Sequence, residues 1–306
     1  MKIGFVFPGQ GSQKVGMGKD LYDQDLEVRE LFLSANKILG YDISAICFEG
    51  PDEILTQTAN AQPAIFLVSA ALLLLLKRKG VVPAFVAGHS LGEITAYYAA
   101  GVLRFEDALR VIQARGTAMA ASYPSDDSAM AAIMKVELDV IQRIVSSVED
   151  GPVVAANLNC PGQIVISGKK AGVTEACDLL SKEGGRAIML NVSGAFHSPL
   201  MAAGSEKLAV FLQDKVFASA QLPIILNRTA LPETDADVLK KNLPLQVVSP
   251  VQWIGSMQVM AQHVDRLIEC GPGKVLSGLC RKIVPDLAMV SVSDLESIKG
   301  IENGPQ

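Results

Sequence analysis

The sequence has 306 residues, of which 49% are hydrophobic, 19% charged and 5% aromatic. This is the composition of a globular chain with enough apolar material for a buried core, and it excludes a disordered chain, a collagen and a disulfide scaffold. The net charge of -5 argues against a nucleic-acid-binding protein, although it leaves room for a local basic patch. The length corresponds to about two domains, or to one large domain that carries an insertion.

The five cysteines include no CxxC pair and are expected to be reduced core residues of a cytoplasmic protein. No cysteine–histidine cluster indicates a zinc site, so we expect no metal. The most apolar stretch, residues 64–76, is shorter than the roughly 18 residues of a membrane span and favours a buried helix. We therefore expect a cytoplasmic monomer that binds neither nucleic acid nor a membrane, and in it the glycosylation sequons at Asn191 and Asn227 are chance matches.

Strand and helix patterns alternate along the first part of the chain. Residues 2–7 form a short apolar run before Pro8-Gly9, as expected of a buried strand followed by a turn. Helices are expected between about residues 18 and 77, and residues 81–87 favour a second buried strand. Two more helices are predicted at 93–100 and 106–121. This alternation predicts an α/β fold with a parallel sheet.

The order of the predicted strands and helices changes near residue 128. Six elements follow in the order βαββαβ, which is typical of a ferredoxin-like fold. They are predicted at residues 130–136, 138–148, 153–157, 163–167, 171–182 and 186–192. We predict that residues 128–193 form a small subdomain inserted into a larger α/β body of residues 1–127 and 194–306. The polar tail from residue 295 onward is expected to be loose.

The segment Gly88-His89-Ser90-Leu91-Gly92 matches the G-x-S-x-G pattern. It lies between a predicted strand and a predicted helix, which is the context of a nucleophile elbow, where the glycines allow a sharp turn that presents the serine hydroxyl. The helix N-terminus behind the turn would place the Leu91 N–H to stabilise an oxyanion. The alternative is a serine that merely caps a helix.

A nucleophilic Ser90 needs a base, and the chain has three histidines. His197 lies in a loop shortly before Pro199, which is expected to start a helix whose positive end favours a neutral imidazole. His89 is adjacent to Ser90 in a sharp turn and is expected to point away, and His263 lies in a predicted amphipathic helix. His197 is favoured, with the other two as alternatives. Because no carboxylate lies in a suggestive loop, a dyad held by a main-chain carbonyl competes with a full triad.

Gln10 lies in a second Gly-rich turn that follows a strand. The glycine spacing fits neither a dinucleotide fingerprint nor a Walker loop. The main-chain N–H of Gln10 is therefore a candidate oxyanion donor opposite Ser90, and a plain tight turn is the alternative.

Arg115 lies on the apolar stripe of the helix predicted at 106–121, together with Ile112 and Met119, whereas Arg110 lies on the solvent side. An arginine on an apolar face is rare unless it is paired. The guanidinium either forms a buried structural ion pair or receives a carboxylate of the substrate. The helix pattern alone does not separate these two roles.

Several of these segments together resemble the malonyl-CoA:acyl-carrier-protein transacylase family. The resemblance covers about residues 3–292, and the segments occur in the family's order. They are Phe7-Pro8-Gly9-Gln10-Gly11-Ser12-Gln13, Gly88-His89-Ser90-Leu91-Gly92-Glu93, Gln113-Ala114-Arg115-Gly116, Gly194-Ala195-Phe196-His197-Ser198, Pro250-Val251-Gln252-Trp253 and Glu269-Cys270-Gly271-Pro272-Gly273-Lys274-Val275-Leu276.

The resemblance implies an α/β-hydrolase-like large subdomain with a parallel sheet, plus the ferredoxin-like insertion. It implies that Ser90 is the acylated nucleophile, that His197 is its base and that Arg115 binds the malonyl carboxylate. It also implies an oxyanion hole formed by the main-chain N–H groups of Gln10 and Leu91.

The resemblance further implies that Gln62 lies near the pocket and that a main-chain carbonyl near Gln252 orients His197. The segment Ala195-Phe196-His197-Ser198 resembles the form of this loop that selects malonyl groups. We therefore expect transfer of a malonyl group from malonyl-CoA to the phosphopantetheine thiol of an acyl carrier protein, for fatty-acid or polyketide synthesis, with no other cofactor.

Carrier proteins are usually acidic, so a basic rim is expected, with Lys274, Arg281 and Lys282 as candidates. Two alternatives stay open: a hydrolase of acyl carrier proteins or an esterase on the same serine elbow, and a non-catalytic docking subunit. Arg115 argues against the hydrolase, because a neutral acyl chain offers a buried guanidinium no partner. The intact set of Ser90, His197 and Arg115 argues against the docking subunit.

Overall fold

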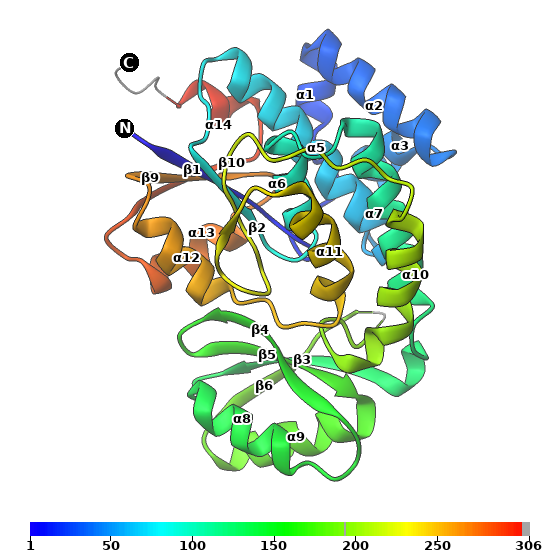
Figure 1. Cartoon of the computed structure of the whole chain (residues 1–306), viewed down its shortest axis with the longest axis vertical. Helices are drawn as coiled ribbons and strands as arrows, with labels where there is room; N and C mark the ends of the chain where they lie inside the picture. The colour runs from blue at the N-terminus through cyan, green and yellow to red at the C-terminus, as the bar shows by residue number, and fades with distance from the viewer. Residues whose placement is uncertain (193, 302–306) are drawn as a thin grey trace.

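The computed structural model describes residues 1–192 and 194–301, which form two sheets and the helices around them (Figure 1). The larger sheet has six strands in the order β10-β9-β1-β2-β7-β8. All neighbouring pairs are parallel except β7 and β8, which are antiparallel. The strands are β1 (Ile3–Phe7), β2 (Phe85–Gly88), β7 (Ile224–Ile225), β8 (Pro232–Glu233), β9 (Arg266–Cys270) and β10 (Ala288–Val292).

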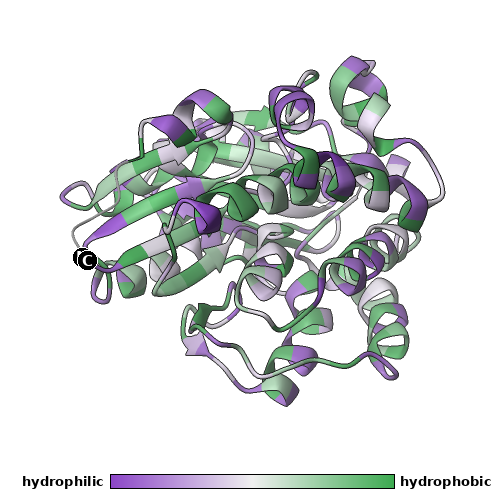
Figure 2. Cartoon of the chain, turned by 90° about the horizontal axis from the view of Figure 1, so that it is seen from above, coloured by the Kyte–Doolittle hydropathy of each residue, from purple (hydrophilic) through white to green (hydrophobic). Residues whose placement is uncertain are grey.

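Helices cover both faces of this sheet (Figure 1). Seen from above, many of them carry hydrophobic residues on one side and hydrophilic residues on the other (Figure 2). The helices outside the small sheet are α1 (Lys19–Gln24), α2 (Leu26–Leu39), α3 (Ile43–Glu49), α4 (Asp52–Leu55), α5 (Thr58–Arg78), α6 (Gly92–Ala99), α7 (Phe105–Ala120), η1 (Ser125–Asp127), η2 (Pro199–Met201), α10 (Ala202–Leu212), α11 (Ala236–Val247), α12 (Trp253–Ala261), α13 (Val275–Ile283) and α14 (Leu295–Lys299).

The long helix α5 contains the apolar stretch noted in the sequence. Its length and hydropathy would suffice for a membrane span, as would those of the bent pair α2–α3 taken together. However, 78% of the most hydrophobic window of α5 is buried inside the protein. Since α5 packs against α2, α3, α6 and α7, it is a core helix, as the sequence predicts.

The second sheet is antiparallel and has the strand order β4-β5-β3-β6. Its two helices lie on the face turned away from the large sheet (Figure 1). The elements are β3 (Ser128–Met134), α8 (Leu138–Ser147), β4 (Val153–Cys160), β5 (Gln163–Lys169), α9 (Lys170–Lys182) and β6 (Arg186–Met189). The predicted α/β class, with a parallel sheet and a second βαββαβ unit, is confirmed.

The edge strand β4 attaches the small sheet to the body. The N–H of Leu158 donates to the carbonyl of Val251 at 2.9 Å, and the N–H of Val251 donates to the carbonyl of Ala156 at 2.8 Å. The division into subdomains at residues 127/128 and 193/194 stays a prediction, and residue 193 itself lies outside the described residues.

The prediction of a loose tail from residue 295 is wrong for its first part. Residues Leu295–Lys299 form α14, which Asp294 caps by accepting from the N–H of Ser297. Ile298 and Ile301 are buried, so two apolar side chains anchor a segment that is polar on average. Residues 302–306 lie outside the described part of the chain.

Candidate active site

The G-x-S-x-G segment forms a tight turn between β2 and α6. Ser90 has a left-handed backbone with φ of 53°, which is uncommon outside glycine and is typical of strained functional turns. A Cβ atom on Gly88 would lie 1.9 Å from the main-chain carbonyl of Gly92, and one on Gly92 would lie 2.0 Å from the carbonyl oxygen of Phe7. Both positions therefore require glycine, and the elbow packs directly against the end of β1.

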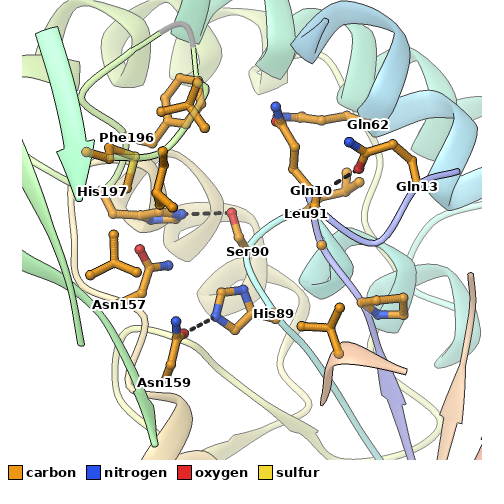
Figure 3. A pocket seen from close by; sticks show the side chains of 18 of the residues that line it. Gln10, Gln13, Gln62, His89, Ser90, Leu91, Asn157, Asn159, Phe196 and His197 are labelled. Atoms are coloured by element: carbon orange, nitrogen blue, oxygen red, sulfur yellow. Dashed lines mark hydrogen bonds between the residues drawn. The ribbon is translucent and has the colours of Figure 1, made fainter. Parts of the chain in front are cut away.

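His197 lies beside Ser90, with its Nε2 2.7 Å from Ser90 Oγ (Figure 3). Its Nδ1 lies 3.0 Å from the main-chain oxygen of Gln246 and 3.1 Å from that of Ser249. Carbonyl oxygens only accept, so Nδ1 carries the proton and Nε2 is free to accept from the serine hydroxyl. This is the tautomer that a general base needs.

Burial is the main cause that lowers the pKa of His197, and the nearby charge of Arg115 adds to it, so that the pKa falls to about 3. The imidazole is therefore neutral at physiological pH. A helix does start at Pro199 as predicted, since η2 is followed directly by α10, and burial and the charge of Arg115 are the causes that lower the pKa.

The carbonyl of Gln252 itself does not orient His197, although that of Ser249, three residues earlier, does. The main-chain oxygen of Gln252 accepts instead from the N–H of Ser256 at 2.9 Å, at the start of α12. The carbonyls that hold His197 belong to Gln246 and Ser249 instead. Within residues 1–192 and 194–301, the hydrogen bonds of the His197 ring include no carboxylate, which favours a dyad over a triad.

The other two histidines have different partners. His89 Nε2 lies 2.8 Å from Asn159 Oδ1, and its ring meets Trp253 edge-on. Figure 3 shows His89 turned from Ser90 toward Asn159. His263 stacks on Phe85 with ring centroids 4.7 Å apart. His197 is thus the histidine that the fold brings to Ser90.

Arg115 is fully buried, and its guanidinium reaches the serine. Its Nη2 donates to Ser90 Oγ at 3.1 Å and to Gln246 Oε1 at 3.0 Å, while Nη1 donates to Gln62 Oε1 at 3.0 Å. The Nε of Arg115 is buried and has no hydrogen-bond partner. Among the described residues no carboxylate forms an ion pair with it. The buried carboxylate of Glu93 acts on the guanidinium electrostatically but does not contact it, so the structure holds a buried cation beside the serine with no direct ion-pair partner among the described residues.

Gln10 and Leu91 both face the pocket around Ser90 (Figure 3). The turn that carries Gln10 is pressed onto the elbow, because a Cβ on Gly9 would lie 2.5 Å from the main-chain oxygen of His89. Within the described chain, the hydrogen bonds include none from the main-chain N–H of Gln10 or Leu91. Two free donors near a serine are what an oxyanion hole requires.

The pocket has a volume of about 340 Å³ and lies between the two sheets. The body contributes Gln62 and Met119, and α13 contributes Leu276. The small sheet contributes Asn157, and Phe196 comes from the loop before His197. In the described residues, no group of three or more His, Cys, Asp or Glu side chains is placed to hold a metal ion.

Comparison with known proteins places this site in a family. The Acyl transferase domain family matches residues 4–276, most of the chain. The chain belongs to the acyl transferase family. A Malonyl CoA-acyl carrier protein transacylase from Bacillus subtilis (strain 168) is 45% identical over 302 residues, which are 97% of this chain and 95% of that protein.

Solved acyl transferases share the whole fold. An acyl carrier protein S-malonyltransferase from Vibrio cholerae superposes with a TM-score of 0.95 at 40% identity and covers 99% of this chain and 100% of its own. A second structure shows a type II PKS acyl-carrier protein in complex with its malonyl-transacylase. That transacylase has a TM-score of 0.95 at 37% identity, and 98% of both chains is covered.

Two residues of this acyl transferase site, Gln246 and Glu93, were not predicted from the sequence. Gln246 contacts all three of the predicted key residues, because its side chain also donates to the main-chain oxygen of Ser90 at 2.9 Å. Glu93 is fully buried, and burial raises its pKa to about 7. No motif identifies Gln246, since its carbonyl is a main-chain group, whereas Glu93 follows the elbow directly and its charge within an apolar helix was a usable signal.

Proposed function

We propose that the chain transfers a malonyl group from malonyl-CoA to the phosphopantetheine thiol of an acyl carrier protein, through a malonyl-serine intermediate. The buried, unpaired guanidinium of Arg115, 3.1 Å from Ser90 Oγ, is the observation that carries this proposal. A malonyl group brings a carboxylate at the far end from its thioester, and this carboxylate would form the direct ion pair that Arg115 does not form with the described residues. The names of the relatives support the same substrate.

The first half-reaction forms the covalent intermediate. His197 Nε2 takes the proton of Ser90 Oγ as the oxygen attacks the thioester carbonyl of malonyl-CoA. The main-chain N–H groups of Gln10 and Leu91 stabilise the oxyanion. The C–S bond then breaks, the proton passes from His197 to the leaving thiolate, and CoA departs as its thiol.

The second half-reaction runs the same steps with a new nucleophile. The carrier protein's phosphopantetheine thiol gives its proton to His197 and attacks the malonyl ester carbonyl. The C–O bond to Ser90 breaks, and His197 returns the proton to the serine. Arg115 holds the malonyl carboxylate throughout, so one binding site serves both steps. We propose that these side chains carry the chemistry with no further cofactor.

The basic rim is proposed to receive the carrier protein. Lys274, Arg281 and Lys282 are exposed on and beside α13, and Val275, Leu276 and Leu279 of this helix line the pocket. Among the described residues none of the three cations forms an ion pair. The solved complex of a related transacylase with its acyl-carrier protein supports a partner of this kind.

A cytoplasmic monomer that serves fatty-acid or polyketide synthesis, with no membrane or nucleic-acid partner, completes the proposal. The bacterial transacylases among its relatives support this setting. Transfer assays with carrier proteins of both pathways separate fatty-acid from polyketide supply. Hydrolysis measured in parallel tests the alternative of an acyl-carrier hydrolase, which Arg115 disfavours.

The intermediate provides the direct test. Incubation with malonyl-CoA followed by intact-protein mass spectrometry should show one added malonyl group on the wild-type protein and none on Ser90→Ala. Addition of a holo carrier protein should then remove the group and place it on the carrier. A wild-type protein that gains no malonyl mass contradicts the mechanism.

A further inference from the structure

Asn227 is fully buried and uses all of its polar groups around the elbow. Its Oδ1 accepts from the Ser90 N–H at 2.7 Å, and its Nδ2 donates to the Gly88 oxygen at 2.6 Å. Its main-chain N–H donates to Glu93 Oε2 at 2.5 Å, and its main-chain oxygen accepts from the Gln252 N–H at 2.7 Å. One side chain thus holds the peptide groups on both sides of His89.

The sheet register brings Asn227 to this place. In the pairing of β2 with β7, Ala87 lies opposite Ile225, so two residues further on Asn227 is level with His89. The two strands are parallel, and each ends at this point. Asn227 therefore lies in a buried turn directly after a core strand, which gives it a fixed position. Its burial also excludes glycosylation of this sequon in the folded protein.

We propose that Asn227 is a positioning residue that holds the elbow in the conformation needed for attack by Ser90. The left-handed backbone of Ser90 is costly and persists only where the surroundings fix it. The side chain of Asn227 fixes this backbone conformation through its hydrogen bonds to the Gly88 oxygen and the Ser90 N–H. Glu93 fixes Asn227 in turn by accepting from its main-chain N–H. This geometry keeps Ser90 Oγ within 2.7 Å of His197 Nε2. The inference rests on the proposed function in taking Ser90 as the nucleophile.

A sulfonyl fluoride such as phenylmethylsulfonyl fluoride tests this role without malonyl-CoA. Ser90 Oγ forms a bond to sulfur, fluoride leaves, and the proton passes to His197. Asn227→Leu keeps a similar side-chain size but removes both elbow bonds, so we expect modification about 10- to 100-fold slower than in the wild type, since small misplacements of reacting groups cost rates of this order. The KM for malonyl-CoA should change less than kcat.

Asn242 offers a matched control. It is as buried as Asn227, and its Nδ2 donates to the other oxygen of Glu93 at 2.9 Å, but it makes no bond to residues 88–90. Asn242→Leu should lose stability yet keep the modification rate within about threefold of the wild type. A folded Asn227→Leu that reacts at the wild-type rate overturns the proposal, as does an Asn242→Leu that slows equally.

A measurement on the wild-type protein covers the case in which Asn227→Leu does not fold. The Ser90 amide, bonded to Asn227, should exchange its hydrogen more than about tenfold slower than the Leu91 amide, whose N–H has no acceptor. Equal exchange contradicts the proposal. The proposed function and the role of Asn227 can be contradicted independently. A wild-type protein that reacts with the sulfonyl fluoride but takes up no malonyl group contradicts the proposed function. The role of Asn227 is then still decided by the modification rate of Asn227→Leu.

Discussion

Arg115 affects both His197 and Ser90. Its positive charge lowers the pKa of His197, which keeps the imidazole free to accept a proton. Its Nη2 also donates to Ser90 Oγ, so the serine hydroxyl lies between a base and a cation. The pKa of the guanidinium itself is lowered to about 10 by burial, which leaves it charged at physiological pH. A substrate carboxylate would relieve this buried charge.

Removal of this charge should abolish the preference for malonyl over acetyl groups. We expect Arg115→Ala to lose about 10- to 100-fold in the ratio of kcat/KM for malonyl-CoA to that for acetyl-CoA, the value of a hydrogen-bonded pair with a charged group. Arg110→Ala, exposed on the same helix, is the control and should leave the ratio unchanged. An unaltered ratio in Arg115→Ala would show that the carboxylate binds elsewhere.

The pH dependence follows from the lowered pKa of His197, about 3 against an ordinary value of 6.5. The neutral base persists as the pH falls through 6.5 and is lost only near the folded pKa. We therefore expect the rate of malonyl-Ser90 formation to show no loss centred near pH 6.5 between pH 8 and pH 5. In Arg115→Ala the pKa of His197 rises, so the loss moves to higher pH.

Glu93 needs its own control in that experiment, because its raised pKa of about 7 lies within the same range. An inflection near pH 7 that vanishes in Glu93→Gln belongs to Glu93. A wild-type loss near pH 6.5 that survives in Glu93→Gln would contradict a depressed His197 pKa.

At the scale of elements, the elbow depends on the close approach of β1, β2 and α6. The carbonyl of Phe7 at the end of β1 occupies the space that a side chain on Gly92 would need. The same contact holds the turn of Gln10 over the serine, since Gly9 touches the main chain of His89. The turn after β1 and the turn after β2 thus lie together and form one site at the carboxyl edge of the sheet.

Substitution of two helical glycines by alanine distinguishes the packing requirement at the elbow from the general effect of glycine on helix stability. Gly92→Ala should destabilise the protein by at least about 3 kcal/mol, because the new methyl group would overlap main chain that cannot move aside. Gly278→Ala, exposed in α13 with no atom within 4 Å, should stabilise it by about 0.5–1 kcal/mol. Urea unfolding of both variants measures the difference. Equal effects would mean that the elbow tolerates a side chain.

The sequence predicted the elements that have a strong period or a turn signal, and it missed those without one. The βαββαβ order is visible because each apolar run is bounded by turn residues, as at Pro161-Gly162 between β4 and β5. Strands β7 and β8 have two residues each, which is too short for any period. Ser90, His197 and Arg115 carry distinctive side chains, whereas the carbonyl of Gln246 is identical in every residue type and could be located only by the fold.

At the scale of the whole molecule, the pocket is shared between the two sheets. His89 of the elbow reaches Asn159 of β4, and Val251 pairs with the same strand. The cations of α13 flank one side of this pocket, although the protein as a whole is acidic. The net charge of this protein therefore does not indicate the charge of its partner, because a local patch of charges governs association.

Charge reversal on α13 should affect only the second half-reaction. We expect the double variant Arg281→Glu, Lys282→Glu to lower kcat/KM for the carrier protein about tenfold, while malonyl-Ser90 still forms at the wild-type rate. Lys182→Glu, exposed on α9 of the small sheet, is the control. Added salt should slow the wild-type carrier step in the same way. If both half-reactions keep their rates in the double variant, the carrier docks on another face.

The central position of β1 has a consequence for synthesis on the ribosome. β1 emerges first, but one of its two neighbours, β9, lies more than 250 residues further along the chain. At roughly 5–20 residues per second, the nascent chain waits at least about 13 seconds with one edge of its middle strand unpaired. An open, apolar strand edge is a template for aggregation. We therefore expect this segment to need shielding during translation, and no nascent chain that stops short of β9 has the completed sheet on which the Gln10 turn rests.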